Sequence, residues 1–167
     1  MQKITPFLWF DDQAEEAANF YVSIFSSRGG GSNTRIVDLV RYGEAGAQAT
    51  GRPVGSAMTV SFQLDGQEFT ALNGGPEFRF TEAVSFVVNC VNQEEVDEFW
   101  DKLSAGGEQG PCGWLKDKFG LSWQIVPSAL GEMFRDKDPK RAERVMAAML
   151  QMKKIDVQAL EQAYAEE

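Results

Sequence analysis

Gln124 follows Trp123 within the stretch Cys112–Pro127, which has the pattern of a short β-hairpin. An amide beside a large aromatic ring can serve as a metal ligand or as a hydrogen-bonding group in a binding cleft. Because side chains alternate along a strand, Trp123 and Gln124 are expected on opposite faces, so at most one of them points into a cleft.

The sequence contains no histidine. This excludes the Ser-His-acid triad, the Cys-His pair and a histidine general base, and it removes the commonest protein ligand of zinc, iron and nickel. Any catalysis would use carboxylates, lysine, tyrosine, cysteine, serine or threonine. Cys90 and Cys112 do not form a CxxC pair, and we interpret both as core thiols.

Charged residues offer few catalytic candidates. Asp11 or Asp12 is expected to cap a helix, and the acidic residues between Glu94 and Asp101 are expected to form a solvated helix face. Arg41, on a predicted strand, either binds a ligand carboxylate or phosphonate or forms a surface ion pair.

Composition limits the partners. A chain of 167 residues with 43% hydrophobic and 25% charged residues is expected to form one compact domain. The net charge of −9 disfavours nucleic acid and anionic membranes, so a small molecule or another protein is the expected partner. Since no apolar run approaches the ~20 residues of a membrane span and no signal-peptide pattern is present, a cytoplasmic location is expected.

The first half of the chain has a strand-helix-strand-strand-strand pattern. Strands are predicted at 4–10, 34–42, 56–64 and 67–73, a helix at 14–25, and loops at 26–33 and 43–55. The glycine run in the first loop lacks the GxxxxGK[ST] phosphate-binding pattern and follows a helix, so we interpret it as a plain loop.

The pattern then repeats. A strand at 83–91 and a capped amphipathic helix at 92–103 match the first unit at a gapless shift of 79 residues. This shift places Phe7 on Phe86, Leu8 on Val87, Glu15-Glu16 on Glu94-Glu95, Phe20-Tyr21 on Phe99-Trp100 and Ile24 on Leu103.

The repeat predicts an α+β fold of two βαβββ modules, whose curved antiparallel or mixed sheets form a cleft, followed by C-terminal helices. The expected boundaries are 1–78 for the first module, 79–127 for a shortened second module and 128–167 for the helical extension. Asp138 with Pro139 and Asp156 are predicted helix starts in that extension. Its methionine-rich face is either a promiscuous binding surface or, as we favour, a packing and dimer contact.

Paired βαβββ modules of this length resemble the vicinal oxygen chelate superfamily of glyoxalases, extradiol dioxygenases and bleomycin-resistance proteins. Five local motifs narrow this resemblance: Pro6-Phe-Leu-Trp-Phe10, AEEAANFY from Ala14, RYGEAG from Arg41, ALNGGP from Ala71 and CGWLKDKFGLSWQIVP from Cys112. Over about residues 3–150 the chain is similar to the PhnB-like branch of this superfamily, which is often labelled demethylubiquinone methyltransferase-like. The sequence lacks the glycine-rich strand-to-helix turn that would hold S-adenosylmethionine in a Rossmann-like fold, which argues against methyl transfer.

The resemblance also implies where a metal would bind. Ligand positions of metal-using members fall on Thr5 or Pro6, near Ala71–Asn73, on Ser85 and on Gln124. Neutral oxygens bind first-row metals weakly, so we expect no tight metal and no cofactor. The implied cleft is lined by Thr5, Phe7, Trp9, Arg41, Phe62, Asn73, Ser85, Val87, Trp114, Ser122 and Gln124.

Two functions stay open at this point. One is a protein that binds a small aromatic or oxygenated metabolite with no or weak turnover, and the other is a metal-dependent lyase, isomerase or dioxygenase that uses Gln124. A third alternative is a dimeric scaffold without a pocket large enough for a ligand. The resemblance implies a homodimer in either case.

Overall fold

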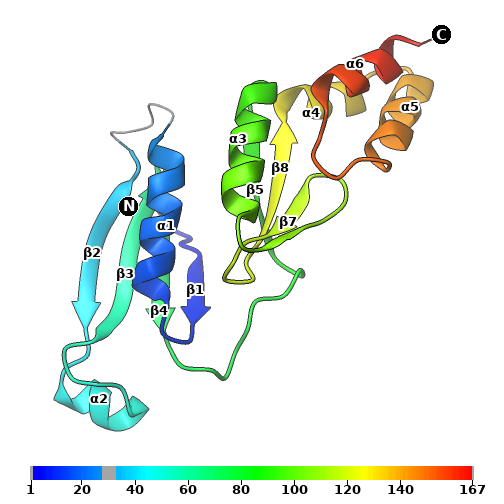
Figure 1. Cartoon of the computed structure of the whole chain (residues 1–167). Coiled ribbons are helices and arrows are strands. Elements are labelled where there is room, and N and C mark those ends of the chain that lie inside the picture. The colour runs from blue at the N-terminus through cyan, green and yellow to red at the C-terminus, as the bar shows by residue number, and fades with distance from the viewer. Residues whose placement is uncertain (1, 28–32, 167) are drawn as a thin grey trace. The chain divides into compact units, whose positions relative to one another are not determined.

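The structure is a computed structural model that describes residues 2–27 and 33–166. The chain divides into two compact units, Met1–Arg79 and Phe80–Glu167, and each unit is described by itself. Figure 1 shows one βαβββ module in each unit and the three C-terminal helices attached to the second. The predicted α+β fold of two modules plus C-terminal helices is thus confirmed.

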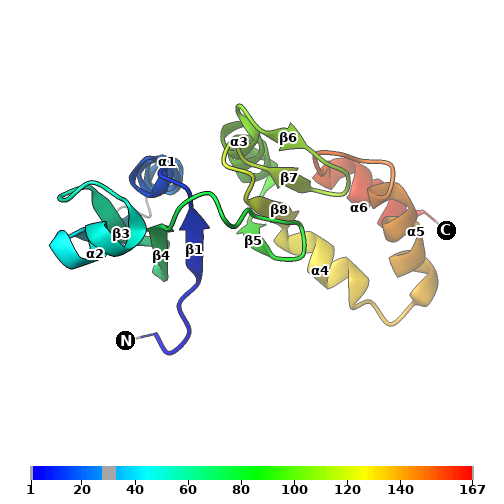
Figure 2. The same cartoon turned by 90° about the horizontal axis from the view of Figure 1, so that it is seen from below.

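The first module is a four-stranded sheet with helix α1 on one face (Figures 1 and 2). Strand β1 runs parallel to β4, and the other neighbours are antiparallel, in the order β1-β4-β3-β2. Tyr21 of α1 stacks on Phe62 of β3, with ring centroids 6.1 Å apart, so this face is the module's core. The elements are β1 Phe7–Phe10, α1 Ala14–Ser26, β2 Arg35–Arg41, α2 Glu44–Thr50, β3 Ala57–Leu64 and β4 Gln67–Asn73.

Helix α2 corrects the loop predicted at 43–55. The segment Glu44–Thr50 has three alanines and an acidic residue in its first turn, both of which favour a helix. Gly51 ends it in the left-handed conformation, at φ 72°. The glycine loop predicted at 26–33 falls largely on residues 28–32, which lie outside the described residues.

The second module repeats this arrangement with a sheet of order β5-β8-β7-β6. Strand β5 runs parallel to β8, and helix α3 buries Val96, Phe99, Trp100 and Leu103. The Asn92 side chain accepts a hydrogen bond from the Glu95 N–H, as the predicted N-cap requires. The elements are β5 Ser85–Cys90, α3 Gln93–Ser104, β6 Glu108–Gln109, β7 Trp114–Lys116 and β8 Ser122–Pro127.

The two modules match at two different shifts. Buried helix residues follow the predicted shift of 79, since Ala17, Tyr21 and Ile24 of α1 correspond to Val96, Trp100 and Leu103 of α3. The buried strand residues instead require a shift of 80, because Leu8 and Phe10 correspond to Val88 and Cys90. The pairings of Phe7 with Phe86 and of Leu8 with Val87 were therefore wrong by one residue. The connection from strand to helix is one residue shorter in the second module, and one residue of slip turns a strand over.

Three helices complete the chain: α4 Ser128–Phe134, α5 Pro139–Met149 and α6 Val157–Ala165. The predicted caps are confirmed, since Asp138 accepts from the Lys140 N–H and Asp156 accepts from the Ala159 N–H. Arg144 of α5 donates to the Ala163 carbonyl of α6 and joins the two helices. Within the described residues, all helices are too short or too polar to span a bilayer.

Candidate functional site

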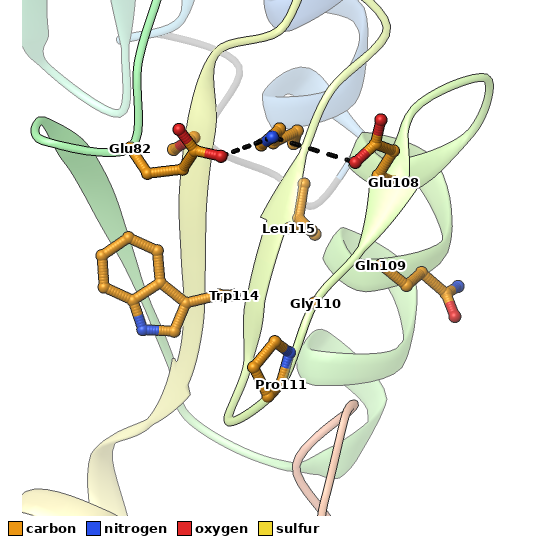
Figure 3. Close-up of a pocket in the computed structure, with 9 residues that line it drawn as sticks. Glu82, Glu108, Gln109, Gly110, Pro111, Trp114 and Leu115 are labelled. Atoms are coloured by element: carbon orange, nitrogen blue, oxygen red, sulfur yellow. Dashed lines mark ion pairs between the residues drawn. The ribbon is translucent and has the colours of Figure 1, made fainter.

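A pocket of about 360 Å³ lies in the second module, beside strand β7 (Figure 3). Apolar side chains form one part of it and an ion-pair cluster forms another. The lining residues are Glu82, Glu108, Gln109, Gly110, Pro111, Trp114, Leu115, Lys116 and Ser122. Two of the residues predicted from the sequence, Trp114 and Ser122, are among them.

The pocket lies on the side of the sheet opposite to α3. Trp123 points to the α3 side, where it is 2% exposed and donates from Nε1 to Asp117 Oδ2 at 2.9 Å. Gln124 therefore lies on the other face, together with Ser122 on the same strand. The predicted separation of Trp123 and Gln124 is confirmed.

Ser122 carries the most informative polar atom of the pocket. It is 1% exposed, and its Oγ has no hydrogen-bond partner within the described part of the chain. Its neighbours across the sheet are Ser85 on β5 and Lys116 on β7. An unsatisfied buried hydroxyl costs about 1–3 kcal/mol, and because the Oγ exposes less than 1 Å², it can gain a hydrogen bond from a bound molecule when the Ser122 side chain rotates towards the pocket.

Gln124 is already partnered. Its Nε2 donates to Ser85 Oγ at 2.9 Å, across the β5–β8 pair. Trp114 is the cross-strand neighbour of Gln124 on the other side. The sheet thus brings the predicted residues Ser85, Trp114, Ser122 and Gln124 together on one face.

The turn before β8 fixes the position of Ser122. Asp117 is 2% exposed, and its Oδ1 accepts from the N–H groups of Phe119 and Leu121 at 2.9 and 3.0 Å. Its Oδ2 accepts from Trp123, so one carboxylate holds the residues on both sides of Ser122. This rigid turn is the structural role of the Lys116–Gly120 segment.

An ion-pair cluster closes one end of the pocket. Lys116 Nζ lies 2.5 Å from Glu82 Oε1 and 3.8 Å from Glu108 Oε2 (Figure 3). The hydrogen bond with Glu82 raises the pKa of Lys116 above its ordinary value, and the same contact lowers the pKa of Glu82. Lys116 therefore stays protonated at neutral pH and cannot serve as a general base there.

Sequence reasoning missed this cluster and the apolar wall at Pro111. Lys116 could have been predicted as a pocket residue, because it lies two residues from Trp114 on the same strand and therefore on the same face. No sequence pattern predicted Glu82, since it precedes β5 in a segment without a periodic pattern.

Val87 is the cross-strand neighbour of Gln124 on β5, and the remaining predicted residues belong to the first module. Asn73 is 6% exposed and lies on the α1 side, where Oδ1 accepts from the Ala14 N–H and Nδ2 donates to the Ala57 carbonyl. Phe62 lies on the same side, between Tyr21 and Phe69. Both side chains thus build the core of this module, and their place in a ligand cleft stays a prediction.

Trp9 and Arg41 also have structural contacts. Trp9 donates from Nε1 to the Gly75 carbonyl at 2.9 Å and packs edge-on against Phe78. Arg41 donates to the Gly55 carbonyl at 3.1 Å. This contact is different from the ligand anion and the surface ion pair that were expected from the sequence. Thr5 and Phe7 are exposed, and Phe7 is on the face of the sheet that α1 leaves uncovered.

The metal that the sequence resemblance implies does not fit this donor set. The described residues hold no group of three histidine, cysteine or acidic side chains arranged to bind a metal. Ser85 and Gln124 are neutral and bonded to each other, while Glu82 is paired with Lys116. A divalent ion needs anionic or imidazole ligands to replace its hydration shell, so these side chains do not suit a divalent metal.

Comparison with known proteins agrees with this fold. The sequence model of the family described as 3-demethylubiquinone-9 3-methyltransferase matches residues 2–126. A PhnB protein from Bacillus cereus with the same methyltransferase name is 37% identical, with a TM-score of 0.63, and the match covers 76% of this chain and 100% of that one. No curated protein matches.

Two further solved structures share the fold at lower identity. A protein from Pseudomonas aeruginosa is 16% identical with a TM-score of 0.59, covering 76% of this chain and 98% of its own. The fosfomycin resistance protein FosX from Listeria monocytogenes is 15% identical with a TM-score of 0.52, covering 79% and 97%. The chain belongs to the 3-demethylubiquinone-9 3-methyltransferase family, the PhnB-like branch of the vicinal oxygen chelate superfamily.

Proposed function

We propose that the second module binds a small planar molecule with a hydroxyl or carbonyl oxygen, without a tightly bound metal. The volume of about 360 Å³ is near the lower end of the roughly 300–1,000 Å³ typical of ligand pockets. Trp114 and Pro111 supply flat apolar walls, which suit a ring.

The buried Ser122 Oγ is the observation that carries this proposal. A ligand oxygen at this point would satisfy a hydroxyl that has no other partner in the described residues. The described residues place no basic side chain in hydrogen-bond contact with this hydroxyl, so it is not activated as a nucleophile. Binding is therefore better supported than acyl or glycosyl transfer.

Methyl transfer, which the family name implies, receives no support from the site. The strand-to-helix connections before α1 and α3, residues 11–13 and 91–92, contain no glycine, and the connection before α2, residues 42–43, has one glycine without the G-x-G-x-x-G pattern that lets a nucleotide approach the backbone. We therefore assign ligand binding and no methyl transfer.

A matched pair of probes tests the proposal. We expect 2-naphthol to bind the protein about 5- to 10-fold more tightly than 2-methylnaphthalene in NMR titrations, since one net hydrogen bond contributes about 1 kcal/mol. Ser122→Ala should abolish this preference, while Ser23→Ala, an exposed serine of the first module, should preserve it.

Two results would count against the proposal. One is an equal preference for 2-naphthol in wild type and Ser122→Ala, and the other is the absence of saturable binding. A stoichiometric metal retained through dialysis and lost in Gln124→Ala would replace it with the metal-dependent alternative.

A homodimer and a cytoplasmic location are part of the same proposal. Phe7 and Val87 occupy equivalent positions at the shift of 80, and they are 60% and 50% exposed on helix-free sheet faces. Such apolar positions favour association. Sedimentation equilibrium should give twice the mass of the chain, and a monomer at micromolar concentration would contradict this.

A further inference from the structure

The wall of the pocket between Pro111 and Trp114 is a tight turn with an unusual conformation. The Trp114 N–H donates to the Pro111 carbonyl at 3.0 Å, and the two central residues have positive φ, 56° at Cys112 and 82° at Gly113. Two positive φ values are typical of a type I′ turn, which favours Asn, Asp or Gly at its first central position. Cysteine has no side-chain amide or carboxylate for this purpose, so other contacts must hold the turn.

The C-terminal extension, residues 128–167, provides those contacts (Figure 1). The Cys112 N–H donates to the Met152 carbonyl at 2.8 Å, and the Gly113 N–H donates to the Lys153 carbonyl at 2.7 Å. Both donors lie between the pocket-lining residues Pro111 and Trp114. The backbone between α5 and α6 thus holds the centre of the turn by two hydrogen bonds.

Close packing reinforces these hydrogen bonds. Ile155 is 1% exposed, and its Cγ1 lies 3.2 Å from the position that a Cβ on Gly113 would occupy. The Ile125 carbonyl oxygen lies 2.8 Å from the same position. The turn therefore fits between strand β8 and the extension only with glycine at 113.

Gln93, the first residue of α3, fixes the extension from the other side. Its Nε2 donates to the Ile155 carbonyl at 3.1 Å, and its Oε1 accepts from the Val157 N–H at 2.8 Å. The two hydrogen bonds lie at the start of α6, directly after Met152 and Lys153, which bind the turn. Gln93 does not line the pocket.

We propose that the C-terminal extension positions the Pro111–Trp114 wall of the pocket, with Gln93 as the residue that holds the extension in place. The proposal rests on the proposed ligand site for its functional meaning. The match to the family model ends at residue 126, so the C-terminal extension lies outside the matched region. Ligand binding and docking of the extension are then reciprocally coupled.

Hydrogen exchange and fluorine NMR test the positioning without any ligand. In Gln93→Leu, we expect the Cys112 and Gly113 amides to exchange at least ~10-fold faster than in wild type, because docking of the extension is weakened. The 5-fluorotryptophan resonance of Trp114 should shift, while that of Trp9 in the first module should not move. Lys154→Ala is the matched control, since it removes only exposed ion pairs between the extension and α3.

Val157→Pro provides a second variant if Gln93→Leu does not fold. Val157 is the first residue of α6, where proline is well tolerated, and the change removes the N–H that donates to Gln93 Oε1. Unchanged exchange at Cys112 and Gly113, within ~2-fold in the folded variants, would overturn the inference. Failure of 2-naphthol to bind wild type would refute the proposed function and leave these two readouts unaffected.

Discussion

Asp117→Asn is predicted to destabilise the second module strongly, although it changes a single atom of a side chain. The wild-type carboxylate accepts from three N–H groups, those of Phe119, Leu121 and Trp123. In the variant, an amide oxygen can keep the two backbone bonds, but its NH₂ group would face the Trp123 indole N–H. Two donors would then oppose each other in a site that is 2% exposed.

The magnitude follows from these contacts. Hydrogen bonds to a charged group contribute about 1.5–3 kcal/mol, and neutral ones about 0.5–1.5 kcal/mol, so the two backbone bonds lose roughly 1 kcal/mol each. The orphaned indole N–H adds about 1–3 kcal/mol. Because neighbouring bonds are not additive and a buried charge is removed, we expect a total loss of about 2–4 kcal/mol in the free energy of unfolding.

Urea denaturation followed by the indole N–H signals of Trp100 and Trp123 measures this loss in the second module. Asp65→Asn is the matched control, since Asp65 is exposed in an Asp-Gly turn at φ 48°, where asparagine is equally suitable. The control should change stability by less than about 0.5 kcal/mol. A loss below about 1 kcal/mol in Asp117→Asn, or an equal loss in the control, would refute the reasoning.

Three more outcomes are expected in the other parts of the chain. Asn73→Ala should lower the stability of the first module by about 2–3 kcal/mol in urea, since the buried Ala14 N–H and the partly buried Ala57 carbonyl lose their partner, and leave 2-naphthol binding within ~2-fold. Gly74→Ala should cost about 1–3 kcal/mol in the same assay and change the fluorescence of Trp9, whose ring occupies the space that the new Cβ needs. Tyr164→Phe should raise the pKa of Asp136, which the Tyr164 hydroxyl holds below its ordinary value of 3.8, as a carboxyl NMR titration would show. Since a lowered carboxyl pKa adds stability above pH 3.8, the stability gap between wild type and Tyr164→Phe should narrow as the pH falls below that value. An unchanged Asn73→Ala midpoint, an unmoved Trp9 spectrum or a pH-independent gap would each contradict the corresponding prediction.

The sequence predicted the modules well because the repeat signal lies in amphipathic periodicity. Helix faces that bury Tyr21 and Trp100 follow three-and-four spacing, which packing against a sheet preserves. Local signals also predicted the caps at Asn92, Asp138 and Asp156. These features depend on residues close together in the chain.

Contacts between distant residues could not be predicted in this way. The start of α1 has no side-chain cap from Asp11 or Asp12, and the Ala14 N–H donates instead to Asn73, 59 residues away. Asn73 was predicted as a cleft residue from the family resemblance, which does not show which face of its strand packs against the helix. The alternation of β4 places it with Ala71 on the buried side.

The candidate site shows the same division. Trp114 and Ser122 were predicted from the cleft that the family resemblance implies, and both lie on strands. The ion pair of Lys116 with Glu82 joins residues of separate segments, and its geometry depends on the tertiary structure. The hydrogen bonds from Cys112 and Gly113 to the backbone carbonyls of residues 152 and 153 likewise depend on the tertiary structure.

The shorter connection between β5 and α3 has a practical consequence for anyone who recombines the two halves of this protein. A chimera that moves a strand from one module to the other should carry the strand's own connection with it, three residues between β1 and α1 and two between β5 and α3, because the spacing to the helix decides which side of the strand is buried. Duplicated modules can thus keep a common core while differing in the length of a single joint.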